Sequence, residues 1–204
     1  MFEPFETINL GPISLSYMLL FLIVSIAAGY FSVQMYLKTY SKAEKESVSD
    51  ALIVAIILSL IVYKSWPFIL EPSLITSFQQ LLYYSGGPYA ILAASTVAVT
   101  YFGFQYYRKK WSSKTIDSIV FGSALTLFTY SIFIKEYGAV SSLSFGYTIG
   151  DLTYHMVNVY YAWFLMLIIV GAFLFVSSRK RLGRSLFIVI GFLFAYVIVS
   201  PFQL

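Results

Sequence analysis

His155 is the only histidine in the chain, and its imidazole side chain is the first feature that suggests a chemical role. It stands three positions before Asn158, so the two side chains share a face if this stretch is helical. A histidine in this place can carry a proton or donate to a lipid headgroup, because its ordinary pKa lies near physiological pH. The alternative is a hydrogen-bonded histidine with a structural role, and the sequence leaves both interpretations open.

Two other groups could act with this histidine. Lys135 and Glu136 lie upstream of it and supply a cation and a carboxylate. Gly86 and Gly87 form a pair directly before Pro88. Such a pair leaves bare backbone that a lipid or a peptide can approach closely. Gly-Gly-Pro is equally a plain signal for the start of a helix.

Most catalytic and metal-binding motifs are missing from the sequence. With no cysteine and a single histidine, the chain cannot build a typical zinc site, so we expect no metal. It has no nucleophile elbow, no glycine-rich phosphate loop and no His-Glu-x-x-His motif. We also expect no cofactor. An active enzyme would have to use His155 as its base, with Glu136 or Lys135 nearby.

The elements that position these residues are predicted to cross a membrane. Hydrophobic residues make up 59% of the 204 residues and charged residues only 11%, with a mean hydropathy of +0.81. Soluble domains carry about a quarter charged residues, so a soluble enzyme is excluded. We predict an all-α integral membrane protein, a single domain over 1–204 with a bundle of six transmembrane helices. The apolar stretches are 13–37, 51–70, 89–107, 116–134, 156–177 and 185–202.

The basic residues predict how these helices are oriented. The loops after the first, third and fifth stretches hold eleven of the thirteen Lys and Arg, leaving only Lys64 and Lys135 on the other side. Positively charged loops stay in the cytoplasm, which places both termini outside. These loops face anionic headgroups, so the net charge of +4 needs no nucleic acid to explain it.

Two local features belong to the outer side in this topology. Pro67 and Pro72, on either side of Glu71, predict that the second helix breaks near its end. The segment 73–88 that follows is too short to span, and it predicts an interfacial or re-entrant helix that ends at Gly86.

The order of features along almost the whole chain resembles the bacterial prolipoprotein diacylglyceryl transferases. Members of that family transfer a diacylglyceryl group from phosphatidylglycerol to the cysteine of a lipoprotein precursor. The similar segments are Leu10-Gly11-Pro12-Ile13, which resembles the strand-and-helix entry of the family, Ser85-Gly86-Gly87, Phe133-Ile134 with Glu136-Tyr137-Gly138, His155 to Tyr160, and Gly183 to Phe187.

The chain departs from that family at its functional positions. The arginine and asparagine of the signature fall on Thr129 and Ile132, and the histidine before the glycine pair is Ser85. The tyrosine of the first span falls near Met18, and a late arginine falls near Ser200 or Pro201. In the family, these arginines hold phosphate and developing charge, which a hydroxyl cannot imitate. The resemblance therefore implies a retained fold without the transferase chemistry.

This comparison leads to three hypotheses. The first is a non-catalytic relative in the bacterial cytoplasmic membrane, with an outward-facing groove for a phospholipid (phosphatidylglycerol by resemblance), a lipidated peptide or another membrane protein. The second is an active transferase that uses different residues. The third is a small transporter subunit, which the lack of a charge deep in any span disfavours. For the first, the predicted binding residues are Ser85, Gly86, Gly87, His155, Asn158 and Tyr160.

Overall fold

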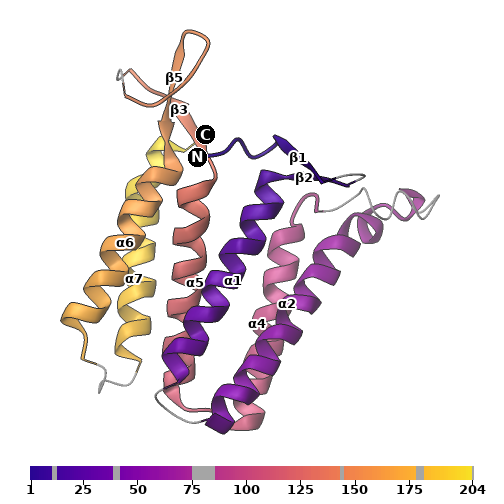
Figure 1. Cartoon of the computed structure of the whole chain (residues 1–204), viewed down its shortest axis with the longest axis vertical. Coiled ribbons are helices and arrows are strands. Elements are labelled where there is room, and N and C mark those ends of the chain that lie inside the picture. The colour runs from indigo at the N-terminus through magenta and orange to yellow at the C-terminus, as the bar shows by residue number, and fades with distance from the viewer. Residues whose placement is uncertain (11–12, 39–41, 75–85, 143–144, 178–181, 204) are drawn as a thin grey trace. The chain divides into compact units, whose positions relative to one another are not determined.

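The computed structural model describes residues 1–10, 13–38, 42–74, 86–142, 145–177 and 182–203 (Figure 1). These residues belong to two compact units. The first unit combines Met1–Thr39 with Ser113–Leu204, and the second consists of Tyr40–Ser112. The first unit is therefore discontinuous in sequence. That the whole chain forms one transmembrane domain stays a prediction.

Four antiparallel helices make up most of the first unit (Figure 1). Helix α5 packs against each of the other three, and α6 also packs against α7. A 3-10 turn over Ser200–Phe202 follows α7. The helices are α1 (Tyr17–Leu37), α5 (Ser113–Phe133), α6 (Val157–Phe175) and α7 (Gly183–Val199).

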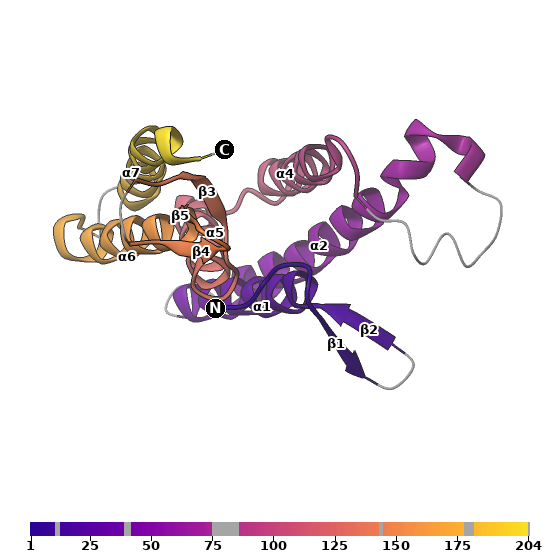
Figure 2. The ribbon, with the colours of Figure 1, turned by 90° about the horizontal axis from the view of Figure 1, so that it is seen from above.

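Short antiparallel strands are attached to these helices. Strands β1 (Thr7–Leu10) and β2 (Ile13–Ser16) form a hairpin that leads into α1, and Figure 2 shows it projecting from the start of that helix. The other three strands form a sheet in the order β3-β5-β4 between α5 and α6. They are β3 (Tyr137–Val140), β4 (Tyr147–Ile149) and β5 (Leu152–Met156).

The second unit is built on a pair of long helices. Helix α2 (Lys42–Leu70) packs against α4 (Ala90–Lys109), and a 3-10 turn over Pro72–Leu74 follows α2. The predicted interfacial helix over 73–88 lies mostly at 75–85, outside the described residues.

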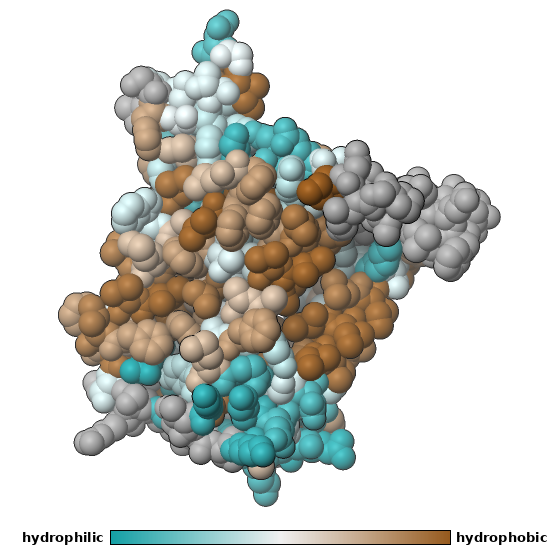
Figure 3. Space-filling view, in the orientation of Figure 1, coloured by the Kyte–Doolittle hydropathy of each residue, from teal (hydrophilic) through white to brown (hydrophobic). Residues whose placement is uncertain are grey.

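Among the described residues, five helices are long and apolar enough to cross a membrane, namely α1, α2, α5, α6 and α7. Their outward faces are hydrophobic, as Figure 3 shows for the visible side, and Leu174, Phe175 and Val197 are each more than 65% exposed. Such exposure would be unfavourable in water but suits a lipid surrounding. Helix α4 is equally long but carries Ser95, Thr96 and Gln105, which lower its hydropathy. Six membrane crossings therefore remain a prediction.

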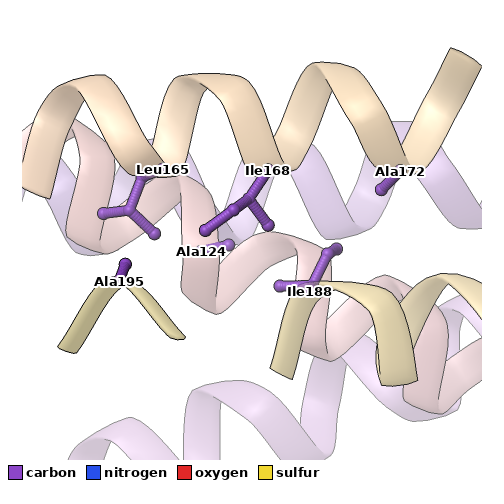
Figure 4. Close-up of a cluster of buried hydrophobic side chains, with 6 residues drawn as sticks. All are labelled: Ala124, Leu165, Ile168, Ala172, Ile188 and Ala195. Carbon is purple, nitrogen blue, oxygen red and sulfur yellow. The ribbon is translucent and has the colours of Figure 1, made fainter. Parts of the chain in front are cut away.

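The core of the first unit lies between α5, α6 and α7. Its buried side chains are small or branched, so the helices approach closely and the side chains interlock (Figure 4). They are Ala124, Leu165, Ile168, Ala172, Ile188 and Ala195.

Small residues bring α1 and α5 into close contact. A Cβ atom added to Gly29 would lie 2.7 Å from the Gly122 carbonyl oxygen and would also clash with the Thr126 hydroxyl. A Cβ on Gly122 would lie 2.5 Å from Val33. Because apolar contact between helices gains little in lipid, such backbone approach is a main source of helix association there.

Replacing Gly29 by alanine is expected to destabilise the first unit by about 1–3 kcal/mol, because the clash with a backbone carbonyl forces the helices apart. Thermal unfolding of the purified protein in detergent measures this change. Gly103→Ala in α4 is the matched control, since its Cβ would meet nothing within 4 Å. Equal melting temperatures for the two variants would contradict the close packing.

The boundaries of several elements differ from the prediction. Residues 13–16 form β2, so the first helix begins at Tyr17 rather than at 13. Helix α2 begins at Lys42 instead of 51. The chain is also not purely helical, because the three-stranded sheet lies between the fourth and fifth predicted spans.

The predicted break near Glu71 is confirmed, since α2 ends at Leu70, but the helix continues through Pro67. A proline has no N–H and leaves the carbonyl four residues earlier, that of Tyr63, without its helical partner. The Gly86 N–H donates to this Tyr63 carbonyl at 3.2 Å instead. The hydrogen bond that the proline removes is thus replaced from another part of the same unit.

Candidate functional site

The predicted binding residues are divided between the two units. His155, Asn158 and Tyr160 belong to the first unit, and Gly86 and Gly87 to the second. Ser85 lies outside the described residues. A single site made from both groups therefore stays a prediction, and each group is characterised within its own unit.

The first unit has two chemically different ends. We call the end with Lys38, Lys114 and Arg184 its basic end. At the opposite end, the sheet end, β3, β4 and β5 lie beyond α5 and α6, and both termini of the chain lie there as well (Figure 1). Phe2 forms a β-bridge with Ile134 at this end, which ties the N-terminus to the segment after α5.

His155 lies in β5 and contacts two aromatic residues. Its Nδ1 atom lies 3.1 Å from the Tyr160 hydroxyl oxygen. The Phe202 ring lies 4.9 Å from the His155 ring and 5.7 Å from the Tyr160 ring, measured between centroids. We call these three residues the aromatic cluster. The structure thus brings together two residues of the predicted site, His155 and Tyr160.

A glycine allows the aromatic cluster to form. A Cβ on Gly138 in β3 would clash with the Phe202 carbonyl oxygen and lie 3.2 Å from the His155 Cβ. Any larger residue at this position would push the turn that carries Phe202 away from β3.

His155 and Asn158 do not share a helical face, because the stretch between them is not one helix. His155 belongs to β5, and α6 begins only at Val157, because the Val157 N–H donates to the Glu136 carbonyl at the junction. The chain therefore changes from strand to helix between the two residues, and the three-residue spacing no longer puts them on one face.

Asn158 is buried, with 1% of its surface exposed, and its carboxamide forms hydrogen bonds with other groups of the protein. Its oxygen accepts from the Glu136 N–H and the Tyr147 hydroxyl, each at 3.2 Å. Its nitrogen donates to the Ser131 carbonyl at 3.0 Å. The side chain therefore joins the end of α5 to the sheet and to the start of α6.

Lys135 is held by an ion pair at the sheet end. Its ammonium group lies 2.7 Å from the Glu3 carboxylate, which also accepts from the Tyr137 hydroxyl at 2.5 Å. The hydrogen bonds from Lys135 and Tyr137 lower the pKa of Glu3, and the bond to Glu3 raises the pKa of Lys135. Burial, together with its bond to Glu3, raises the pKa of Tyr137 to about 12.

Replacing Glu3 by glutamine is expected to cost up to about 1 kcal/mol of stability at neutral pH, the usual worth of a partly exposed pair. A carboxylate whose pKa is lowered by folding stabilises the fold fully at pH values above its ordinary pKa of 4.5. This contribution is lost as the pH falls through the lowered pKa. The difference in melting temperature between wild type and variant should therefore vanish in acid. A difference that persists below the lowered pKa of Glu3 would contradict the ion pair as its cause.

The backbone of Glu136 bonds to Val157 and to the Asn158 side chain. Desolvation raises the pKa of its carboxyl group above the ordinary value. Within the part of the chain that the structure describes, no hydrogen bond joins this carboxylate to the His155 ring.

Thr129 and Ser200, where the predicted resemblance would place arginine, carry hydroxyl groups that bond to their own helices. Thr129 donates to the Leu125 carbonyl at 2.8 Å, and Ser200 donates to the Val197 carbonyl at 3.1 Å. Each hydroxyl has one proton to donate, so neither has a second one for a phosphate.

The glycine pair of the second unit has two distinct roles. Gly86 is buried, and a Cβ there would lie 2.6 Å from the Tyr63 hydroxyl. Gly87 is exposed, with a φ of 102° and open space around its Cβ position. Its carbonyl accepts from the Ala90 N–H at the start of α4. The pair thus opens α4 as predicted, and no described residue would contact a Cβ on Gly87.

Asp117 is a buried carboxylate whose partner the sequence did not indicate. It is 1% exposed and accepts from the Ser185 N–H at 3.1 Å and from the Ser185 hydroxyl at 2.5 Å. Ser185 lies in the first turn of α7, so the carboxylate caps this helix from α5. Its position beside the basic loops was visible in the sequence, but a pairing across 68 residues was not.

Asp117→Ala is expected to destabilise the first unit by about 1–3 kcal/mol, because two hydrogen bonds to a charged group are lost. Asp117→Asn is the matched variant, since its amide oxygen can still accept from Ser185, and it should cost less. Thermal unfolding of both variants measures the two effects. Equal losses would mean that the hydrogen bonds to Ser185 are not what matters.

No protein-family model and no curated protein matches this chain.

Proposed function

We propose that this chain is a six-span protein of the bacterial cytoplasmic membrane, with both termini outside, that binds a phospholipid or a lipidated peptide at the sheet end of its first unit. We also propose that it is a non-catalytic relative of the prolipoprotein diacylglyceryl transferases, the family its sequence resembles. Phosphatidylglycerol is the lipid that this resemblance suggests.

The distribution of charge supports the proposed orientation. In the first unit, Lys114 and Arg184 lie at the end opposite to both termini (Figure 1). In the second unit, Lys42 and Lys45 begin α2, and Arg108 and Lys109 end its antiparallel partner α4. Each unit thus has one basic end, as a protein that follows the positive-inside rule requires.

The aromatic cluster is the observation that carries the binding proposal. When the Tyr160 hydroxyl donates to Nδ1 of His155, the neutral ring carries its proton on Nε2. Nε2 has no hydrogen-bond partner among the described residues, so its proton is available to a phosphate or carbonyl oxygen. Tyr160 and Phe202 supply the apolar surface that the glycerol and acyl parts of a lipid need.

The hydroxyls of Thr129 and Ser200 support the absence of transferase activity. Moving a diacylglyceryl group to a thiol breaks the bond between glycerol carbon and phosphate oxygen, and negative charge develops on the leaving phosphate. Arginine stabilises such charge with a two-pronged set of donors, and its loss typically costs orders of magnitude in rate. Hydroxyl protons already given to helix carbonyls cannot replace it.

Native mass spectrometry of the gently purified protein tests the binding proposal. We expect bound phosphatidylglycerol in the wild type and at least a several-fold loss of occupancy in His155→Ala and in Tyr160→Phe, because both disturb the Nε2 donor. Tyr107→Phe, in α4 and 85% exposed, serves as the control. Adding Gly87→Leu to His155→Ala should reduce occupancy further if both units contribute to the site.

Unchanged occupancy in the two cluster variants would contradict the proposed site. Release of glycerol phosphate from phosphatidylglycerol in the presence of a lipoprotein precursor peptide would instead favour an active transferase, with His155 as its base.

A further inference from the structure

A small polar pocket lies between α2 and α4 in the second unit, near the end where α2 begins and α4 ends. We call it the α2–α4 pocket. Its volume of about 120 Å³ exceeds the ~10–15 Å³ of such space that a single water molecule needs. Its lining combines acidic, basic, hydroxyl, amide and aromatic groups with two apolar side chains. These residues are Ser47, Asp50, Ala51, Val54, Tyr101, Gln105, Lys109 and Trp111.

Gln105 lines this pocket, and its amide oxygen accepts no hydrogen bond from the described residues. Its amide nitrogen donates to the Tyr101 hydroxyl at 3.0 Å, which fixes the orientation of the side chain. The amide oxygen is buried and has no hydrogen-bond partner within the described part of the chain. Buried polar atoms in native proteins are nearly always paired, so the pocket is suited to a ligand that donates hydrogen bonds.

The charges around the pocket specify this ligand further. The Asp50 carboxylate adds a negative charge to the lining, and the Trp111 ring adds an aromatic wall, so a cation is favoured. Lys109 also lines the pocket, and Arg108 and Lys110 flank it at the end of α4, so a nearby anion is favoured as well. A primary ammonium group linked to a phosphate satisfies both requirements.

The surrounding structure holds the pocket in shape. The Glu44 carboxylate accepts from the backbone N–H of Ser112 at 2.9 Å and from its hydroxyl at 2.7 Å, which ties the start of α2 to the end of α4. Trp111 is 8% exposed and packs against the Phe102 ring at 5.3 Å. A pocket fixed in this way loses little entropy when a ligand binds.

We propose that the α2–α4 pocket binds the headgroup of an aminophospholipid. The ammonium group donates to the Gln105 oxygen and the Asp50 carboxylate, and the phosphate pairs with Lys109. The apolar part of α2 begins directly after Asp50, so the pocket lies where headgroups meet hydrocarbon and the acyl chains extend past Val54. This site lies in the second unit, whereas the site at the sheet end lies in the first unit and uses different residues. Either proposal can therefore fail without the other.

The test compares phosphatidylethanolamine with phosphatidylcholine, whose three methyl groups leave no N–H to donate. Detergent-purified protein is incubated with each lipid, and retention is measured by native mass spectrometry together with the melting temperature. We expect phosphatidylethanolamine to be retained and to raise the melting temperature, with at least a ten-fold preference over phosphatidylcholine. Gln105→Met and Asp50→Asn should each abolish most of that preference. Glu46→Gln, on the exposed part of α2 outside the pocket, should leave it unchanged.

The stability of Gln105→Met without lipid separates a ligand site from a structural one. Because the substitution removes an unpaired buried acceptor, this variant should melt at or above the temperature of the lipid-free wild type. Equal retention of the two lipids, or unchanged preference in both pocket variants, would overturn the proposal. Equal protection by soluble phosphoethanolamine would overturn its assignment to a lipid.

Discussion

Backbone hydrogen bonds at the ends and irregularities of the helices are the constraint on which this structure depends. A hydrocarbon surrounding offers no donors or acceptors, so each free backbone group must find its partner in the protein. The carbonyl freed by Pro67 accepts from Gly86, and the N–H groups of Tyr17 and Met18 donate to carbonyls of the N-terminal segment. Asp117 fulfils the same need for α7. Much of what surrounds the helices is therefore there to complete them.

This constraint also explains why polar residues at the sheet end have different roles. The sequence predicts Asn158 as a ligand residue, yet its carboxamide is hydrogen-bonded to Glu136, Tyr147 and Ser131. His155 and Tyr160 are bonded to each other and leave one ring nitrogen available. His155 and Asn158 lie only three positions apart, yet their side chains bond differently because β5 ends between them.

Long apolar runs could be located from the sequence because they record burial in lipid directly, and each predicted span overlaps one of the long helices. The polar start of α2 was missed because it has no apolar run, although Ala43 and Glu44 favour a helix. The sheet had a usable signal in Gly150-Asp151, a typical two-residue hairpin turn between short β-prone segments. The partners of Asn158 and Asp117 could not be predicted, since single residues far apart in sequence leave no periodic pattern.

The discontinuity of the first unit has a consequence for biosynthesis. Helix α1 leaves the ribosome early, but its partner α5 follows only after the whole of Tyr40–Ser112 has been made. At the usual rates of translation, on the order of 5–20 residues per second, this interval lasts several seconds. During that time the face of α1 that carries Gly29 has no helix to pack against. The nascent chain is therefore most exposed to mispairing or to capture by insertion chaperones at this stage.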